Sequence, residues 1–215
     1  MGDISSFSHT TRERPVEMFG QQASESSIQI KRIDVASRAL DTLRVQAQAL
    51  GMHRLALDFR LRERLHRSRL PGLRGYGAIE GNELLGFTYG LSSENSEWWR
   101  RYTVPHLRDS GNKGWTEGTF LVCELHVLPS YQHRGLGTQL ISELCAHAVE
   151  PRSVLSTPHG PTPARQLYKF LGYRDLVEKV SFPGVREPFS LMGAELPLAA
   201  RIILAESGVD GADSH

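Results

Sequence analysis

The sequence of 215 residues has few cysteines and no long apolar run, and its charges almost cancel. The two cysteines occur in no Cys-x-x-Cys or Cys/His spacing, so we expect no metal site. No uncharged apolar stretch reaches the roughly 18 residues of a membrane span, and the first residues lack the apolar core of a secretory signal. The formal net charge of +1 creates no global field towards nucleic acid or membrane. These absences predict a cytoplasmic protein that binds neither nucleic acid nor membrane.

Lysine is also scarce, and arginine outnumbers it 21 to 4. A run of arginines precedes Pro71, within an expected helix. One interpretation is a nucleic-acid-binding helix, which salt-dependent binding to arbitrary DNA would reveal. The run contains no interleaved aromatic residues, and the overall charge is near neutral. We therefore interpret one face of this helix as solvated, formed by Arg60, Arg64 and Arg67.

Hydrophobic periodicity divides the rest of the chain into alternating strands and helices. A helix is expected to follow the first strand, with Asp34 or Ser37 as its cap, an apolar face of Leu40, Leu43, Ala47 and Leu50, and Gly51 at its end. A second helix carries leucines at every fourth position, Leu57, Leu61 and Leu65. Strands are expected near 28–33, 76–80, 84–91, 119–128, 153–157, 173–182 and 189–196. The mixture predicts an α/β or α+β class with a mixed sheet, in which Gly81-Asn82 forms a hairpin turn.

The pattern breaks between residues 92 and 118, where serine, asparagine and glycine predict a long loop. A short helix is expected inside it, around Trp98 and Trp99. This tryptophan pair is expected either to anchor the loop or to form an apolar wall for a substrate. For the chain as a whole we expect a flexible arm over 1–27, one domain over 28–196 and a tail over 197–215.

An apolar strand, a glycine-containing loop and an amphipathic helix follow one another between residues 120 and 148. The loop is Gln132 to Thr138, and the helix has Leu136, Leu140 and Leu144 on one face. Cys123 and Cys145, on the strand and the helix, are expected to be buried free thiols in a reducing compartment. The loop directs free backbone N–H groups at one point, and the helix N-terminus adds about +0.5 of partial charge. This arrangement predicts a phosphate or pyrophosphate site.

The glycine loop does not fit the two most familiar phosphate motifs. No lysine follows the glycines, as a P-loop requires, and the third glycine position of a dinucleotide fingerprint is Leu140. The pattern L-x-V-x-P-x-x-Q-x-x-G-x-G from Leu125 to Gly137 instead resembles the pyrophosphate motif of the GNAT acyltransferases. The resemblance implies a central sheet, mostly antiparallel and flanked by helices, and acetyl-coenzyme A as cosubstrate. It also implies direct acyl transfer to a primary amine of a small molecule or peptide, and it leaves a homodimer open.

A second motif supports the resemblance. Thr162-Pro163 has the sequence of a helix start, and Gly172 stands where a left-handed C-cap belongs. The segment from Ala164 to Tyr173 resembles the GNAT pattern A-x-x-L-Y-x-x-x-G-[FY]. The chain departs from the family at Pro161, where many members have an asparagine that contacts the coenzyme.

The resemblance implies roles for individual residues. Tyr168 would protonate the departing thiolate, and the backbone N–H of Val127 would polarise the thioester carbonyl. Glu124 and His126 share one face of the strand, so either side chain is placed to act as the general base. Glu124 is the expected base, with His126 or water as alternatives. The residues expected to bind the coenzyme are Leu125, Val127, Gln132, His133, Arg134, Gly135, Leu136, Gly137, Thr138 and Tyr168. The alternative function is a non-catalytic sensor that binds acyl-coenzyme A on the same fold.

Overall fold

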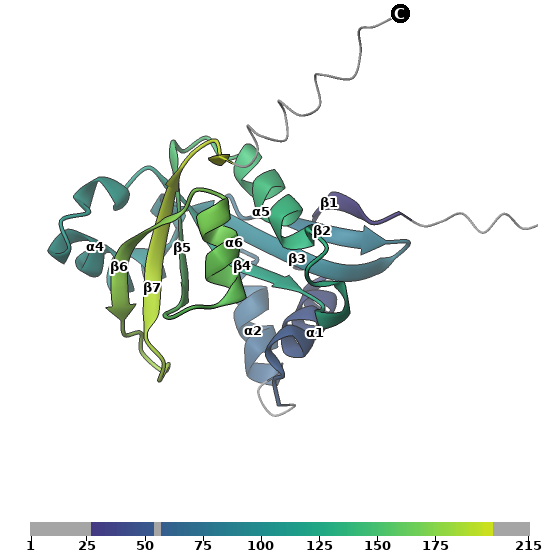
Figure 1. The fold of residues 1–215 in the computed structure, drawn as a ribbon. Coiled ribbons are helices and arrows are strands. Elements are labelled where there is room, and N and C mark those ends of the chain that lie inside the picture. The colour runs from purple at the N-terminus through teal and green to yellow at the C-terminus, as the bar shows by residue number, and fades with distance from the viewer. Residues whose placement is uncertain (1–26, 54–56, 200–215) are drawn as a thin grey trace, which may run out of the picture.

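The computed structural model describes residues 27–53 and 57–199, which form one sheet with helices on both faces (Figure 1). The sheet has seven strands in the order β1-β2-β3-β4-β5-β7-β6. Only β4 and β5 are parallel neighbours, which confirms the predicted mixed, mostly antiparallel sheet. The strands are β1 (Gln29–Ile33), β2 (Arg74–Glu80), β3 (Glu83–Ser92), β4 (Thr119–Val127), β5 (Arg152–Pro158), β6 (Arg174–Val180) and β7 (Phe189–Glu195).

The helices divide between the two faces of the sheet (Figure 1). On one face, α5 and α6 pack over β4 through a core that includes Phe120, Leu140 and Leu171. On the other face, α1, α3 and α4 cover two further cores, one around Phe87 and one around Leu107. The helices are α1 (Ala39–Leu50), α2 (Leu57–Arg67), α3 (Glu97–Tyr102), α4 (Val104–Asp109), α5 (Leu136–Ala146) and α6 (Pro163–Phe170).

A β-bulge interrupts β4 at Cys123. Tyr89 of β3 pairs with Glu124, whereas Gly90 pairs with Val122, so β4 has one extra residue at this point. Val122 faces the α5 side, and Cys123 belongs to the cores on the opposite side. The β4–β5 ladder also ends here, because its last pair is Val122 with Leu155. Bulges bend and twist a strand, and the two parallel strands diverge beyond this one.

Several turns and helix ends occur where local sequence signals predicted them. Residues 81–82 join β2 to β3, with Gly81 at a φ of +59°. Gly51 ends α1 in the left-handed conformation, and Gly172 has a φ of +94° just after α6. The side chain of Thr162 caps α6 by accepting a hydrogen bond from the N–H of Arg165.

Two expectations for α1 were wrong. Neither Asp34 nor Ser37 caps it, since both side chains make hydrogen bonds within the preceding turn. Leu40 and Leu50 are 69% and 59% exposed, so they do not belong to its buried face. That face is formed instead by Ala39, Thr42, Leu43, Val45 and Gln46.

Residues 92–118 are more helical than the predicted loop, because α3, α4 and two 3-10 turns fill most of the segment. The short helix expected around the tryptophans is α3. Trp99 is 4% exposed and its indole N–H donates to the Thr116 carbonyl, whereas Trp98 is 45% exposed and packs against Tyr102 and Phe182. The pair therefore anchors this segment to the sheet.

The expected arm over 1–27 and the tail over 197–215 lie almost entirely outside the described residues. Of the tail, Leu198 is buried in the core beneath α5. In the described ranges, no helix is long and apolar enough to cross a membrane. The same ranges hold no group of three or more histidine, cysteine, aspartate or glutamate side chains arranged to bind a metal ion.

Candidate functional site

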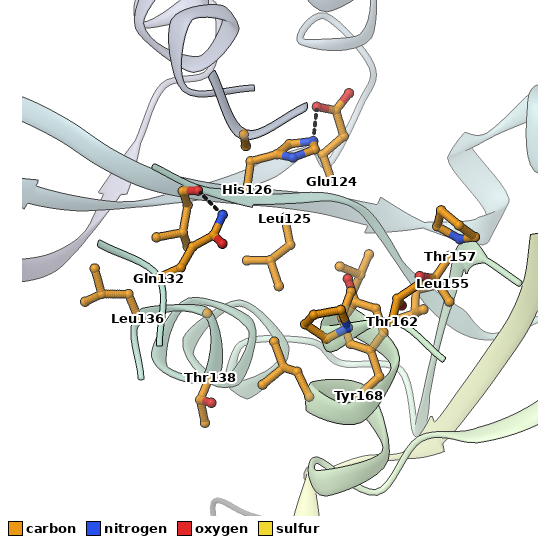
Figure 2. Close-up of a pocket in the computed structure, with 18 of the residues that line it drawn as sticks. Glu124, Leu125, His126, Gln132, Leu136, Thr138, Leu155, Thr157, Thr162 and Tyr168 are labelled. Atoms are coloured by element: carbon orange, nitrogen blue, oxygen red, sulfur yellow. Dashed lines mark hydrogen bonds and ion pairs between the residues drawn. The ribbon is translucent and has the colours of Figure 1, made fainter. Parts of the chain in front are cut away.

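A cavity of about 690 Å³ lies where β4 and β5 diverge. Its walls come from β4, the loop before α5, the first turn of α5, the end of β5, the start of α6 and the end of α1. Figure 2 shows these side chains converging from both sides of β4. Every residue predicted for the site lines the cavity except Arg134. The guanidinium of Arg134 instead lies 5.0 Å from the ring centre of Tyr131.

The loop before α5 presents a row of free N–H groups to the cavity. His133 and Gly135 have φ angles of +60° and +79°, a conformation that turns successive amides in one direction. The first amide of α5 with a helical partner is Gln139, which donates to the Gly135 carbonyl. No described acceptor pairs with the N–H groups of residues 133–138. The positive end of the helix dipole points to the same place, so the loop suits a pyrophosphate.

Glycine at position 137 allows α5 and α6 to approach each other. A Cβ atom there would lie 3.2 Å from Cδ2 of Leu167, closer than ordinary van der Waals contact. The close approach places α6 beside the loop, and Tyr168 of α6 shares the cavity with it.

Gln132 acts on the backbone of β4. Its side-chain amide donates to the Val127 carbonyl over 3.0 Å. The residue after Val127 is Leu128, and its N–H donates to the carbonyl of Leu85 in β3. Because backbone groups alternate in direction along a strand, the Val127 N–H points away from β3, towards the side where β5 has diverged. The structure thus leaves an unpaired strand amide facing the cavity.

Tyr168 is held by the packing of α6. Its ring meets Tyr173 edge-on at 5.9 Å, and a partly buried ion pair of 2.9 Å between Arg165 and Asp175 ties α6 to β6. No described residue accepts or donates a hydrogen bond at the Tyr168 hydroxyl. Burial raises the pKa of Tyr168 to about 12, so the phenol keeps its proton at neutral pH. It is therefore available to donate to a group in the cavity.

Glu124 and His126 point to the opposite side of β4 from Leu125 and Tyr168 (Figure 2). They nevertheless line the same cavity, because it passes through the gap between β4 and β5. The position of Glu124 beyond the sheet therefore does not separate it from the groove on the α5 side. Its role as general base stays a prediction.

The solvated arginine face predicted for α2 is wrong at its centre. Arg64 is 2% exposed and is the buried residue of α2, whereas the leucines of the expected stripe are only partly covered. Its guanidinium donates to Glu124 over 2.7 Å and to Gln46 over 2.8 Å. One sign of a partner is visible in the sequence, because Glu124 is a charge inside an otherwise apolar strand, and such charges are paired when buried.

Cys123 also lines the cavity. Burial raises the pKa of its thiol to about 12, so it is not a thiolate nucleophile at neutral pH. The tryptophans of α3 are not among the described residues that line this cavity, which favours the interpretation that they anchor the segment.

The family model and the relative that this chain matches both describe acetyltransferases. Residues 43–173 match the model of a family described as the acetyltransferase (GNAT) family. A Mycobacterium tuberculosis protein named GCN5-like protein acetyltransferase Rv2170 is 30% identical over 151 residues, which cover 66% of this chain and 73% of the relative.

Solved structures share the fold at low sequence identity. A GNAT-family putative acetyltransferase from Desulfovibrio desulfuricans aligns with a TM-score of 0.60 at 16% identity, covering 79% of this chain and 99% of its own. YncA from Salmonella typhimurium, solved with acetyl-CoA, aligns with a TM-score of 0.56 at 18% identity, covering 80% and 95%. PaiA N-acetyltransferase from Thermoplasma acidophilum, solved with coenzyme A, gives 0.53 at 13% identity, covering 79% and 99%.

Proposed function

The chain belongs to the acetyltransferase (GNAT) family, and from this premise we propose that it transfers the acetyl group of acetyl-coenzyme A directly to a primary amine. The transferase domain would span residues 28–196, with 1–27 and 197–215 as flanking segments. The observation that carries the proposal is that three kinds of group share one cavity. Its wall includes the loop of residues 133–138 with its free amides, Val127 with its inward N–H, and Tyr168 with its hydroxyl.

Each group along the cavity has a role in the proposed reaction. The amides of the loop and the α5 dipole would hold the pyrophosphate of the coenzyme. The N–H of Val127 would donate to the thioester oxygen as negative charge develops on it. The hydroxyl of Tyr168 would protonate the thiolate that leaves. Holding both substrates in one cavity supplies much of the rate, because it replaces a collision with a positioned encounter.

For the acceptor we propose the amine of a protein or peptide. The relative from Mycobacterium tuberculosis is named a protein acetyltransferase, and this supports a peptide acceptor as the first to test. The acceptor would enter from the α1 side, past Leu50, Glu124 and His126, because the coenzyme loop fills the opposite end of the cavity.

Two measurements test the function. Acetyl-coenzyme A is expected to raise the melting temperature, as any ligand of the native state does. Lysine-containing peptides and a library of primary amines, each added with acetyl-coenzyme A, are expected to include an acceptor that releases free thiol. A melting shift with no thiol release for any amine would favour the sensor, which binds acyl-coenzyme A without turnover. A folded protein with no melting shift would contradict both functions.

A further inference from the structure

Helix α2 is attached to the sheet by a charge. Its buried residue is Arg64, and its guanidinium stacks over the rings of Phe87 and Tyr89 at 4.9 and 5.4 Å. The guanidinium ends on Glu124, 2.7 Å away. Burying an arginine beside the cavity carries a large desolvation cost, which the ion pair with Glu124 offsets.

Glu124 has little capacity left to accept another proton. The hydroxyl of Tyr89 donates to Oε1 over 2.6 Å, and Arg67 lies 3.6 Å from the same oxygen. Oε2 accepts from Arg64 and, over 3.1 Å, from Gln46. Burial alone would raise the pKa of Glu124, but the hydrogen bond from His126 and the charge of Arg64 outweigh it and lower the pKa below its ordinary value. The carboxylate is therefore a fixed anion and a weak base.

His126 lies next to this anion and lines the same cavity. Its Nε2 lies 3.5 Å from Oε2 of Glu124, and its ring packs against Phe87 at 5.5 Å. Nε2 faces both the Glu124 anion and the side-chain amide of Gln46. With the hydrogen on Nε2, the neutral ring donates to the anion and leaves Nδ1 free to accept a proton. No described residue makes a hydrogen bond at Nδ1. The ring lines the cavity on the side where the acceptor would enter.

We propose that His126 takes the proton from the acceptor amine, and that Arg64 and Glu124 are the positioning residues that hold its ring for this step. The proposal rests on the proposed acetyl transfer. It changes the role predicted for Glu124 from base to fixed anion, and it assigns Arg64 a role that its sequence context did not suggest.

The proposed step releases one proton to the solvent overall. The acceptor ammonium loses a proton to Nδ1 of His126, and the amine nitrogen attacks the thioester carbon. The C–N bond forms and the C–S bond breaks, while Tyr168 donates its proton to the sulfur. The nitrogen loses a second proton through His126, and one proton from the solvent restores Tyr168. The products are an amide, the free thiol of coenzyme A and one proton released to the solvent.

The polar, charged and titratable groups around His126 come from three elements besides its own. Arg64 and Arg67 approach Glu124 from α2, and Glu63 neutralises part of Arg67 at 3.8 Å. Gln46 reaches from α1, 3.4 Å from Nε2. Tyr89 of β3 remains a neutral phenol, because burial and Glu124 raise its pKa well above the ordinary value. Cys123 on β4 is likewise neutral.

The first test needs no acceptor. The ring nitrogen signals of His126 are recorded by NMR in the full chain, and His126→Gln assigns them. Glu124→Gln is expected to move the ring hydrogen from Nε2 to Nδ1 in part of the molecules, because the anion that faces Nε2 is lost. Arg64→Met is expected to change the same signals, because Glu124 loses its nearest cation, and Arg64→Lys to restore them partly. Arg62→Met, on the exposed side of α2, serves as the matched control and is expected to leave them unchanged.

Unchanged His126 nitrogen signals in Glu124→Gln would overturn the positioning role. If circular dichroism shows that Arg64→Met does not fold, the positioning role is decided by Glu124→Gln and Arg64→Lys. Acetyl-coenzyme A must still raise the melting temperature of each variant, so a change of His126 is not confused with a lost coenzyme site.

The second test measures turnover as thiol release, with acetyl-coenzyme A and a lysine-containing peptide blocked at its N-terminus. His126→Gln is expected to lower kcat about 100-fold and to remove the acid limb of the pH profile. Glu124→Gln is expected to lower kcat by less and to keep that limb, because His126 is still present. If Glu124→Gln lowers kcat more than His126→Gln does, and His126→Gln keeps the wild-type limb, Glu124 is the base and the proposal is wrong. If the wild type releases no thiol, the proposed function fails for this acceptor, and the NMR comparison still decides the positioning.

Discussion

At the scale of single residues, the hydroxyl of Tyr168 is the proton donor that the cavity offers on the coenzyme side. Tyr168→Phe removes only this oxygen, so the packing against Tyr173 is kept. We expect turnover to fall about 100-fold, with coenzyme binding nearly unchanged. Steady-state kinetics and the acetyl-coenzyme A melting shift measure the two effects. Tyr102→Phe, away from the cavity wall, is the control, and equal turnover in both variants would make Tyr168 a packing residue.

Gly135 and Gly111 form a matched pair for testing the phosphate loop. Their φ angles are +79° and +81°, and neither side chain position is crowded by a neighbour closer than 3.9 Å. Alanine at either position therefore carries a similar backbone strain, about 1 kcal/mol. Only Gly135→Ala changes the amides that face the cavity, so only it is expected to weaken acetyl-coenzyme A binding. Calorimetry measures the affinity, and equal losses in the two variants would contradict a phosphate site at this loop.

At the scale of elements, the two tryptophans of α3 make different contributions to stability. Trp99 is buried in the core that joins α3 to the sheet, whereas Trp98 is half exposed. We expect Trp99→Ala to lower the free energy of unfolding by about 3–5 kcal/mol and Trp98→Ala by clearly less. Urea denaturation measures both. Neither variant is expected to change the KM of the acceptor while it remains folded, and a raised KM for Trp98→Ala alone would restore a contact with substrate.

Local signals predicted the elements of the site well. The helix start at Thr162-Pro163, the left-handed Gly172 and the strand, loop and helix around Gln132 each depend on residues close in sequence. The segment 92–118 was predicted less well, because its polar residues serve as helix ends. Ser96 caps α3, and Gly111 follows α4 in the left-handed conformation.

The burial of Arg64 could not be predicted from its neighbours. On a helical wheel Arg64 shares a face with Arg60, which is exposed to solvent. Its burial depends on Glu124, which is 60 positions away in the sequence. It also depends on the bulge at Cys123, because the bulge sets the face on which Glu124 lies. Periodicity reports the average environment of a helix face, and a single long-range ion pair is invisible to it.

At the scale of the whole molecule, buried neutral acids predict how stability changes in alkali. Burial raises the pKa of Cys145 from about 9 to about 11 and that of Tyr168 to about 12. The folded state therefore keeps protons that the unfolded state loses near the ordinary values. Stability is fully present below about pH 9 and falls as the pH rises through 11.

Chemical denaturation between pH 7 and pH 10.5 measures this fall. Cys145→Ala removes one of the raised groups, so its free energy of unfolding is expected to fall less between pH 9 and pH 10.5, by on the order of 2 kcal/mol. A wild type equally stable at pH 8 and pH 10.5 would contradict the prediction.

The extra residue at Cys123 has a consequence for comparing this chain with its relatives. Cys123 and Glu124 follow one another on the same side of the sheet, so β4 tolerates a one-residue deletion at 123 without reversing any later side chain. A one-residue deletion or insertion elsewhere in β4 would turn the later side chains of the strand to the opposite faces of the sheet. Glu124 and His126 would then lie on the coenzyme side, and Leu125 and Val127 on the acceptor side. A sequence alignment that places its gap one position away from 123 would therefore compare residues on opposite faces. Differences in length among relatives are expected to concentrate at this single position.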